Sequence, residues 1–219
     1  MRKIYFIFTF CLILLFASFY GTYSYFSDSK VSGVNTYTVT SVFPTSPVYS
    51  TPPITPTEAQ IAVGAILINE INTHVNAIDE WVELFNTTSS SINVSGWKIN
   101  DEDFSDIIPN VPPIPAGGYA VIIAADSNVI PPLNSIKIQL TSAIGNSLNA
   151  NNEALSLRLP DNTIIDALSW GTLTTFFNPS VTGSTNGKTM SRFPNGIDTN
   201  TAIDWISTSS ATLGISNNP

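Results

Sequence analysis

From residue 61 onward, apolar residues either alternate with polar ones or form short solid runs, and turn-forming residues separate these stretches. Alternation with a period of two is typical of β-strands, and no window of 12 or more residues has helical periodicity. The pattern predicts strands at residues 65–73, 80–87, 96–100, 118–124, 135–140, 154–159 and 163–169, with a last one at 204–207.

Residues with strong turn preferences stand between the predicted strands. Gly117 with Gly118, Pro131 with Pro132, and residues 160–162 (PDN) are examples. Seven or more short strands at this spacing favour an all-β fold, an antiparallel β-sandwich of the immunoglobulin type.

The first 24 residues have a different pattern. A basic start at Arg2 and Lys3 precedes an apolar run over residues 4–20, and small residues follow up to Ser24. This pattern predicts a signal peptide that is cleaved after Ser24, so the protein is expected to be secreted or displayed on the cell surface. The alternative is an uncleaved membrane anchor, for which the apolar run is short.

The pattern divides the rest of the chain into four parts. Residues 25–43 form a Ser/Thr-rich mature N-terminal segment, and residues 44–60 form a Pro/Thr-rich linker. Proline lacks the N–H donor that a helix or a sheet requires, so we expect the linker to act as an extended spacer. The globular domain spans residues 61–216, and residues 217–219 are a short tail.

The composition of the chain excludes some classes of partner and of chemistry. Sixteen acidic residues against eight basic ones give a net charge of -8, which repels phosphate backbones, so no nucleic acid partner is expected. The single cysteine, Cys11, lies in the N-terminal apolar run, which excludes cysteine-based catalysis and cysteine metal sites from the domain.

The mature N-terminus carries a first resemblance. The motifs YFSD at residues 25–28 and GVNTYT at residues 33–38 are similar to the start of secreted biofilm-matrix and camelysin-type proteins. That resemblance implies release by a dedicated signal peptidase, and some relatives assemble into surface fibres through such N-terminal strands.

The domain carries a second and more specific resemblance, in blocks that follow one another over most of its length. These blocks are INEI at 68–71, EWVELFN at 80–86, VSGWKI at 94–99, IPAGGY at 114–119, IGN at 144–146, NNEALSL at 151–157, IDALSWG at 165–171, SRFPNG at 191–196 and DW at 204–205. Together they resemble the lamin-tail domain. The ending TLG at 212–214 departs from the Thr-Pro-Gly of that family, because Leu213 replaces its proline.

This resemblance implies an immunoglobulin-like sandwich that serves as a binding or attachment module, without catalysis. Because a signal peptide precludes a nuclear protein, the relevant branch is that of bacterial secreted proteins. The residues expected to define the fold are Asn69, Glu70, Trp81, Glu83, Gly96, Trp97, Gly117, Arg192 and Trp205.

Acidic and aromatic residues stand close together between residues 66 and 101. Trp81 and Val82 are adjacent, so one of them must leave the main core face of its strand. We expect Trp81 or Trp97 to pack in the core. We expect Glu70 and Glu83 to bond to backbone N–H groups, or to the basic residues Arg192 or Lys98.

A calcium site is the alternative interpretation of the acidic residues, because Ca²⁺ prefers oxygen ligands. The candidate ligands are Glu70, Asp79, Glu83, Asp101 and Asp103, together with Glu80, Glu102 and Asp106. The acidic run at residues 101–106 lacks the central glycine and distal glutamate of a helix-loop-helix calcium loop. The interpretation we favour is therefore a solvated loop and no cofactor.

The sequence contains no clear catalytic motif. His74 is the only histidine, no Gly-x-Ser-x-Gly motif accompanies it, and no pair of carboxylates stands out, so we do not expect an enzyme. Residues 172–195 are weakly patterned, and Phe176 and Phe177 within them are expected to cover one end of the sandwich if the segment is ordered.

The sequence thus predicts a non-catalytic, secreted or cell-surface binding module of the lamin-tail type. Its expected partner is an extracellular protein or a component of the cell envelope, with a membrane contact only through an uncleaved N-terminal segment. A structural subunit of an extracellular fibre or matrix, assembling through residues 25–43, is the alternative, ahead of a calcium-dependent binder or a hydrolase.

Overall fold

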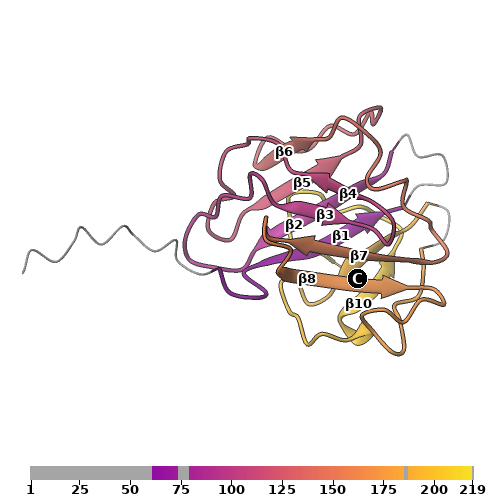
Figure 1. Cartoon of the computed structure of the whole chain (residues 1–219). Coiled ribbons are helices and arrows are strands. Elements are labelled where there is room, and N and C mark those ends of the chain that lie inside the picture. Colours follow the sequence, from indigo (N-terminus) through magenta and orange to yellow (C-terminus); the bar gives the residue numbers. More distant parts are fainter. Residues whose placement is uncertain (1–60, 74–78, 185–186, 219) are drawn as a thin grey trace, which may run out of the picture. The chain divides into compact units, whose positions relative to one another are not determined.

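The computed structural model describes residues 61–73, 79–184 and 187–218, all within the compact unit Pro56–Pro219 (Figure 1). The predicted signal peptide, the N-terminal segment, the linker and His74 lie outside these residues. The described elements are β1 (Ile66–Asn72), β2 (Trp81–Asn86), β3 (Lys98–Asn100), β4 (Ser105–Ile107), β5 (Tyr119–Ile123), β6 (Ser135–Gln139), β7 (Glu153–Arg158), β8 (Ile164–Trp170), β9 (Thr189–Arg192), the 3-10 turn η1 (Ala202–Asp204) and β10 (Trp205–Thr208). No helix in this part of the chain is long and apolar enough to cross a membrane.

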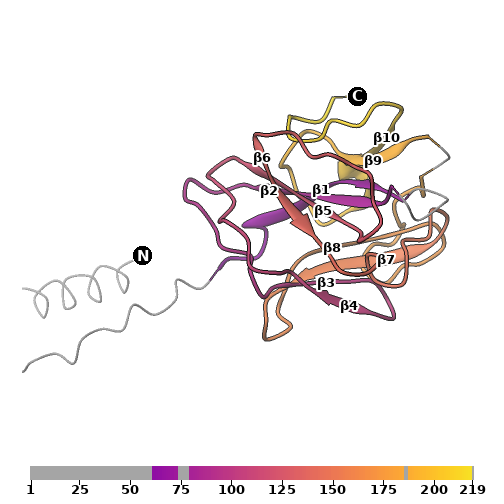
Figure 2. The ribbon, with the colours of Figure 1, turned by 90° about the horizontal axis from the view of Figure 1, so that it is seen from above.

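Two sheets face each other as layers, as Figure 2 shows. One sheet has six strands in the order β10-β9-β1-β2-β5-β6, and the other has four in the order β4-β3-β7-β8. This arrangement confirms the predicted all-β, immunoglobulin-like sandwich.

One strand pair departs from the predicted antiparallel pattern. β6 runs parallel to β5, with Tyr119 opposite Ser135 and Ile123 opposite Gln139. The turn residues Pro131 and Pro132 therefore do not close a hairpin. They lie in a crossover, which a parallel pair requires because both strands must start at the same end of the sheet.

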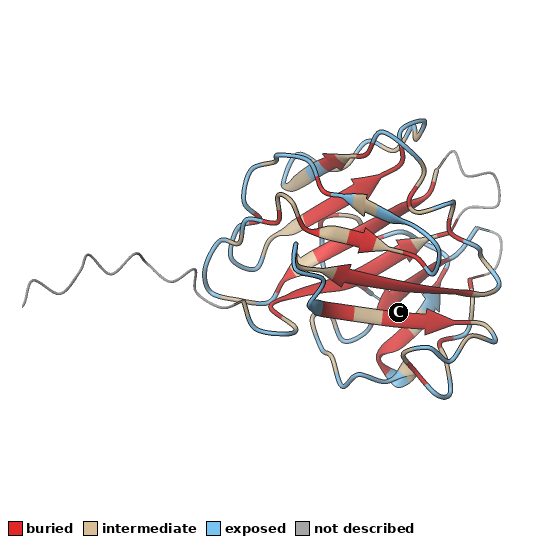
Figure 3. Ribbon diagram, in the orientation of Figure 1, coloured by how far each residue is buried: buried red, intermediate tan, exposed pale blue. Residues whose placement is uncertain are grey.

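The main core fills the space between the sheets. Val82 and Leu84 of β2 contribute to it from the six-stranded sheet, and Leu155 and Leu157 of β7 from the other. Each such side chain contributes about 1.5–3 kcal/mol when fully buried. Buried residues are concentrated on the strands and exposed residues in the loops, as Figure 3 shows.

A second apolar cluster lies on the opposite face of the six-stranded sheet. Trp81, Val121 and Ile123 form it, and Val129 and Leu213 pack against it. Trp81 thus leaves the main core face while its neighbour Val82 stays on it; the sequence predicted that one of the two would leave, but not which one. Trp97, by contrast, is part of the main core.

Two strands were not predicted. β4 lies within and just beyond the acidic run that we interpreted as a loop, and it pairs with β3 at the sheet edge. β9 lies within the weakly patterned residues 172–195 and pairs with both β1 and β10. Its sequence, TMSR, is buried throughout although three of its four residues are polar. Hydrophobic patterning cannot find such a strand, because its burial depends on polar partners elsewhere in the chain.

Two glycines support the fold by their backbone conformation. Gly96 and Gly117 have φ angles of 80° and 63°, in the turns that precede β3 and β5. A residue with a Cβ is disfavoured in this left-handed region, so these positions favour glycine.

Candidate functional site

The acidic residues after β3 bind backbone amides. One oxygen of Asp101 accepts the N–H groups of Asp103 and Phe104 at 2.9 and 2.6 Å, and the other accepts the N–H of Asn146 at 2.7 Å. Asp101 therefore ties its own turn to the distant loop at residues 142–148. Each bond has a charged acceptor, which makes it stronger than a neutral hydrogen bond.

Two further carboxylates hold the same loop. Glu80 is fully buried and accepts the N–H groups of Ile144 and Leu148, both at 2.8 Å. Asp106 accepts the N–H of Gly145 at 2.7 Å. Burial raises the pKa of Glu80, and its two backbone hydrogen bonds oppose that rise. The acidic residues thus organise a loop.

The five candidate calcium ligands, Glu70, Asp79, Glu83, Asp101 and Asp103, do not converge on one point. No group of three or more His, Cys, Asp or Glu side chains in the described residues is arranged to hold a metal ion.

Glu70 and Glu83 form a pair of buried carboxylates. They lie directly opposite each other on β1 and β2, and neither is exposed to solvent. One oxygen of Glu70 accepts the N–H and the hydroxyl of Thr212, both at 2.9 Å. Glu83 accepts the N–H of Gly214 at 2.6 Å and the side-chain amide of Asn69 at 2.8 Å. The expected bonds to backbone N–H groups are confirmed.

The other oxygen of Glu70 faces β9. It accepts the hydroxyl groups of Thr189 and Ser191 at 2.6 and 3.1 Å. These hydrogen bonds satisfy polar side chains of β9, so the polar strand is buried without a large energetic cost.

The environment of Glu83 favours its neutral form. Burial raises the pKa of Glu83 to about 8, and the negative charge of Glu70 adds to this rise. The hydrogen bonds from Asn69 and Gly214 oppose it, but they are outweighed by the loss of hydration.

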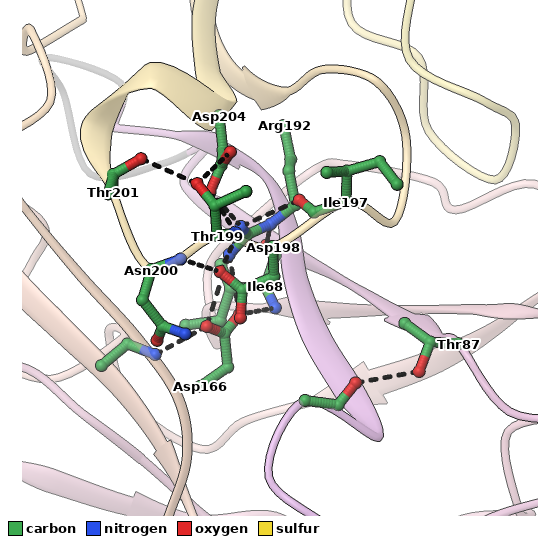
Figure 4. Close-up of polar contacts among 12 residues, drawn as sticks. Ile68, Thr87, Asp166, Arg192, Ile197, Asp198, Thr199, Asn200, Thr201 and Asp204 are labelled. Atoms are coloured by element: carbon green, nitrogen blue, oxygen red, sulfur yellow. Dashed lines mark hydrogen bonds and ion pairs between the residues drawn. The ribbon is translucent and has the colours of Figure 1, made fainter. Parts of the chain in front are cut away.

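The expected basic partners of these glutamates bond elsewhere. Lys98 donates to the side chain of Asn162 at 2.6 Å. Arg192 is fully buried and forms ion pairs with Asp166 at 3.1 Å and Asp198 at 3.0 Å (Figure 4). The interpretation that either basic residue pairs with Glu70 or Glu83 is therefore wrong.

Arg192 is the centre of a larger polar cluster. Its guanidinium donates to the carbonyls of Ile68 and Ile197, both at 3.1 Å, and lies 4.8 Å from the ring centre of Trp205. A third carboxylate, Asp204, lies 3.6 Å from it. Arg192 thus joins β1, β9 and the loop that leads to β10, which suits a guanidinium with five donors.

Asp166 completes this cluster from the four-stranded sheet. It accepts the N–H of Ile68 at 2.7 Å in addition to the ion pair with Arg192. Burial raises the pKa of Asp166 to about 6, although the charge of Arg192 lowers it. The sequence blocks included Asp166 without indicating its role. A buried arginine requires a carboxylate partner, but the sequence does not show which of the acidic residues is near.

The loop at residues 197–204 is held from inside by this cluster. Asp204 accepts the N–H of Thr199 at 2.7 Å, and Asp198 accepts the N–H of Asn200 at 2.9 Å. Ile203, in contrast, is 83% exposed. The loop therefore presents an apolar side chain to solvent from a rigid support.

An open hollow of about 350 Å³ lies beside Ile203, lined by residues 176–179 and 200–203. Phe177 is buried in the core and Phe176 packs against it, whereas their expected place over one end of the sandwich stays a prediction. The side chains of Asn178 and Asn200 at its rim make no hydrogen bond to the described residues. The hollow thus combines an apolar floor with amide groups that can bond to a ligand.

Phe176 also lines a second, smaller hollow. It has a volume of about 180 Å³, and Asp101, Glu102 and Arg158 are among its lining residues. Charged side chains thus form part of the lining of this hollow, whereas all residues that line the first one are uncharged.

One family model matches the chain. The model of the lamin tail domain matches residues 59–172, which contain β1 to β8. No curated protein matches the chain. The segment beyond residue 172 supplies β9, β10 and Arg192, and it completes the six-stranded sheet.

Proposed function

Because the chain belongs to the lamin tail domain family, we propose that it is a binding module that is exported and attaches a protein or a cell-envelope component outside the cytoplasm. The family is an immunoglobulin-like, non-enzymatic one, which favours binding over catalysis. The N-terminal pattern of residues 1–24 supports export.

The observation that carries this proposal is the rigid apolar surface at the hollow. Ile203 and the hollow beside it are presented by a loop that ion pairs and hydrogen bonds hold in place. A surface that is already ordered loses little conformational entropy on binding, so little of the free energy of its contacts is offset by ordering. An exposed apolar group beside an apolar hollow is typical of a contact site.

A capture experiment tests the proposal. The purified chain is immobilised and exposed to extracellular and cell-wall fractions of the producing cells, and Ile203→Asp is compared with the native protein. We expect the substitution to reduce the captured component at least tenfold, because it places a charge at the contact.

Ile130→Asp is the matched control, because Ile130 is 89% exposed in a different loop. This variant should capture as much as the native chain, and both variants should keep the native melting temperature. Equal capture by all three proteins would contradict the assignment of the surface.

A structural subunit of a fibre or matrix is the second candidate, and the edge strand β4 favours it. Ile107 in this short strand is 65% exposed, and Phe104 just before it is 57% exposed. An edge strand of this kind can pair with a strand of another chain. A chain without residues 25–43 should then stay monomeric in sedimentation while the mature chain assembles. If both sediment as monomers, this candidate is excluded.

A further inference from the structure

The C-terminal segment, residues 210–217, lies on the outer face of the six-stranded sheet. It is outside the strand ladders and is held by side chains of the sheet: Thr212 by Glu70, and Gly214 by Glu83. Asn217 donates from its side-chain amide to the carbonyls of Asn69 and Arg192, at 2.9 and 2.8 Å. We call residues 210–217 the C-terminal strap.

The strap covers apolar surface. Leu213, between the two residues that the glutamates hold, packs against the cluster of Trp81, Val121 and Ile123. The strap thus helps to keep Trp81, which is 3% exposed, from solvent.

The two glutamates that hold the strap are a cross-strand pair. On one face of a sheet, directly opposite residues have Cβ atoms about 4.5–5.5 Å apart, and like charges at such positions repel each other. Both carboxylates are buried, so water screens this repulsion poorly. Ionisation of Glu83 strengthens the bond that it accepts from the Gly214 N–H, but it adds this repulsion and the cost of a buried charge, and burial is the largest of these effects on Glu83.

The charged and titratable groups nearest Glu83 on neighbouring strands belong to β1, β5 and β6. Glu70 faces it from β1 and Tyr119 lies on β5, where burial raises the pKa of the phenol. Lys137 on β6 lies in the same cross-strand row, beyond Val121. It is two strands away, about 10 Å, and exposed. The strap itself contains no charged side chain.

We propose that the C-terminal strap is a pH-sensitive cover, closed while Glu83 is protonated and opening when Glu83 releases its proton to solvent. Opening uncovers the apolar cluster around Trp81. This device goes beyond the proposed binding function, because it involves none of the residues that line the hollow at Ile203.

The direction of the pH effect follows from the raised pKa of Glu83, about 8 in the folded protein against an ordinary value of 4.5. A carboxyl group with a raised pKa favours the closed state fully below pH 4.5. That contribution is lost as the pH rises through about 8. Opening is therefore expected on the alkaline side of neutrality.

Amide hydrogen exchange of the full chain tests the proposal. The protection factors of the Thr212 and Gly214 amides should fall about tenfold from pH 7 to pH 9, since closing weakens about tenfold per pH unit up to the pKa of about 8 and levels off above it. The amides of Val82 and Leu84 in the main core should keep their protection factors.

Glu83→Gln should abolish this pH dependence, because the amide cannot ionise. Glu153→Gln is the control, since burial also raises the pKa of Glu153 but that residue does not contact the strap. It should retain the native pH dependence.

If Glu83→Gln does not fold, the native chain alone decides. The carbon chemical shift of the Glu83 carboxyl must then titrate with the same midpoint as the loss of strap protection. Strap protection that does not change between pH 7 and pH 9, or that falls equally in Glu83→Gln, would overturn the proposal.

Discussion

At the scale of residues, burial of polar groups is the main theme of this domain. Glu70, Glu80, Glu83, Asp166 and Arg192 are all buried at 4% exposure or less, and each one has hydrogen-bond partners. A buried charge is costly without partners, so these residues connect distant parts of the chain through the bonds that they require.

The arginine gives the first prediction. Arg192→Leu leaves three carboxylates, Asp166, Asp198 and Asp204, without their buried cation, and should reduce the free energy of unfolding by about 3–5 kcal/mol. Urea denaturation measures this loss. Arg158→Leu, which removes an arginine bonded to Ser156 and Asn162 near the surface, should cost less than about 1 kcal/mol. Similar losses in the two variants would show that the cluster has no special role.

At the scale of elements, alternation found most strands and missed those in which polar residues dominate. β2 was predicted because Val82 and Leu84 alternate with Trp81 and Glu83. β9 was missed because its polar residues face Glu70 and Asp166, which no local pattern reveals. β4 was missed because it is a short edge strand, exposed at two of its three positions.

The two tryptophans test the assignment of the two apolar clusters. Trp97→Ala in the main core and Trp81→Ala beneath the strap should each cost about 3–5 kcal/mol, because both side chains are 3% exposed. Phe104→Ala, at an exposed position, should cost less than about 1 kcal/mol. Denaturant unfolding of the three variants measures these differences. A loss below about 1 kcal/mol at both tryptophans would contradict the assigned clusters.

At the scale of the whole domain, the six-stranded sheet depends on the C-terminal third of the described residues. The matched region ends at residue 172, yet β9 pairs with the central strand β1, and the strap occupies Glu70 and Glu83. The family match therefore does not mark the end of the folding unit.

A truncated chain tests this view. A chain that ends at residue 172 lacks Arg192, Thr212 and Gly214, which bond to Asp166, Glu70 and Glu83, and it leaves one side of β1 unpaired. We expect it to lack cooperative thermal unfolding and to show the narrow amide chemical-shift dispersion of an unfolded chain, whereas residues 59–219 should unfold cooperatively. A cooperative transition in both chains would show that the shorter segment is sufficient.

The sequence by itself determined the fold class, most strands and the divergence of the neighbours Trp81 and Val82 to opposite faces, because these follow from local alternation and turn chemistry. It also placed Glu70 and Glu83 against backbone N–H groups, but it did not identify the donors. Only the tertiary structure decided that Thr212 and Gly214 are those donors, that Arg192 pairs with Asp166, and that β6 runs parallel to β5. Each of these results joins residues far apart in the chain or depends on the route of a connection, and a local pattern carries no information about either.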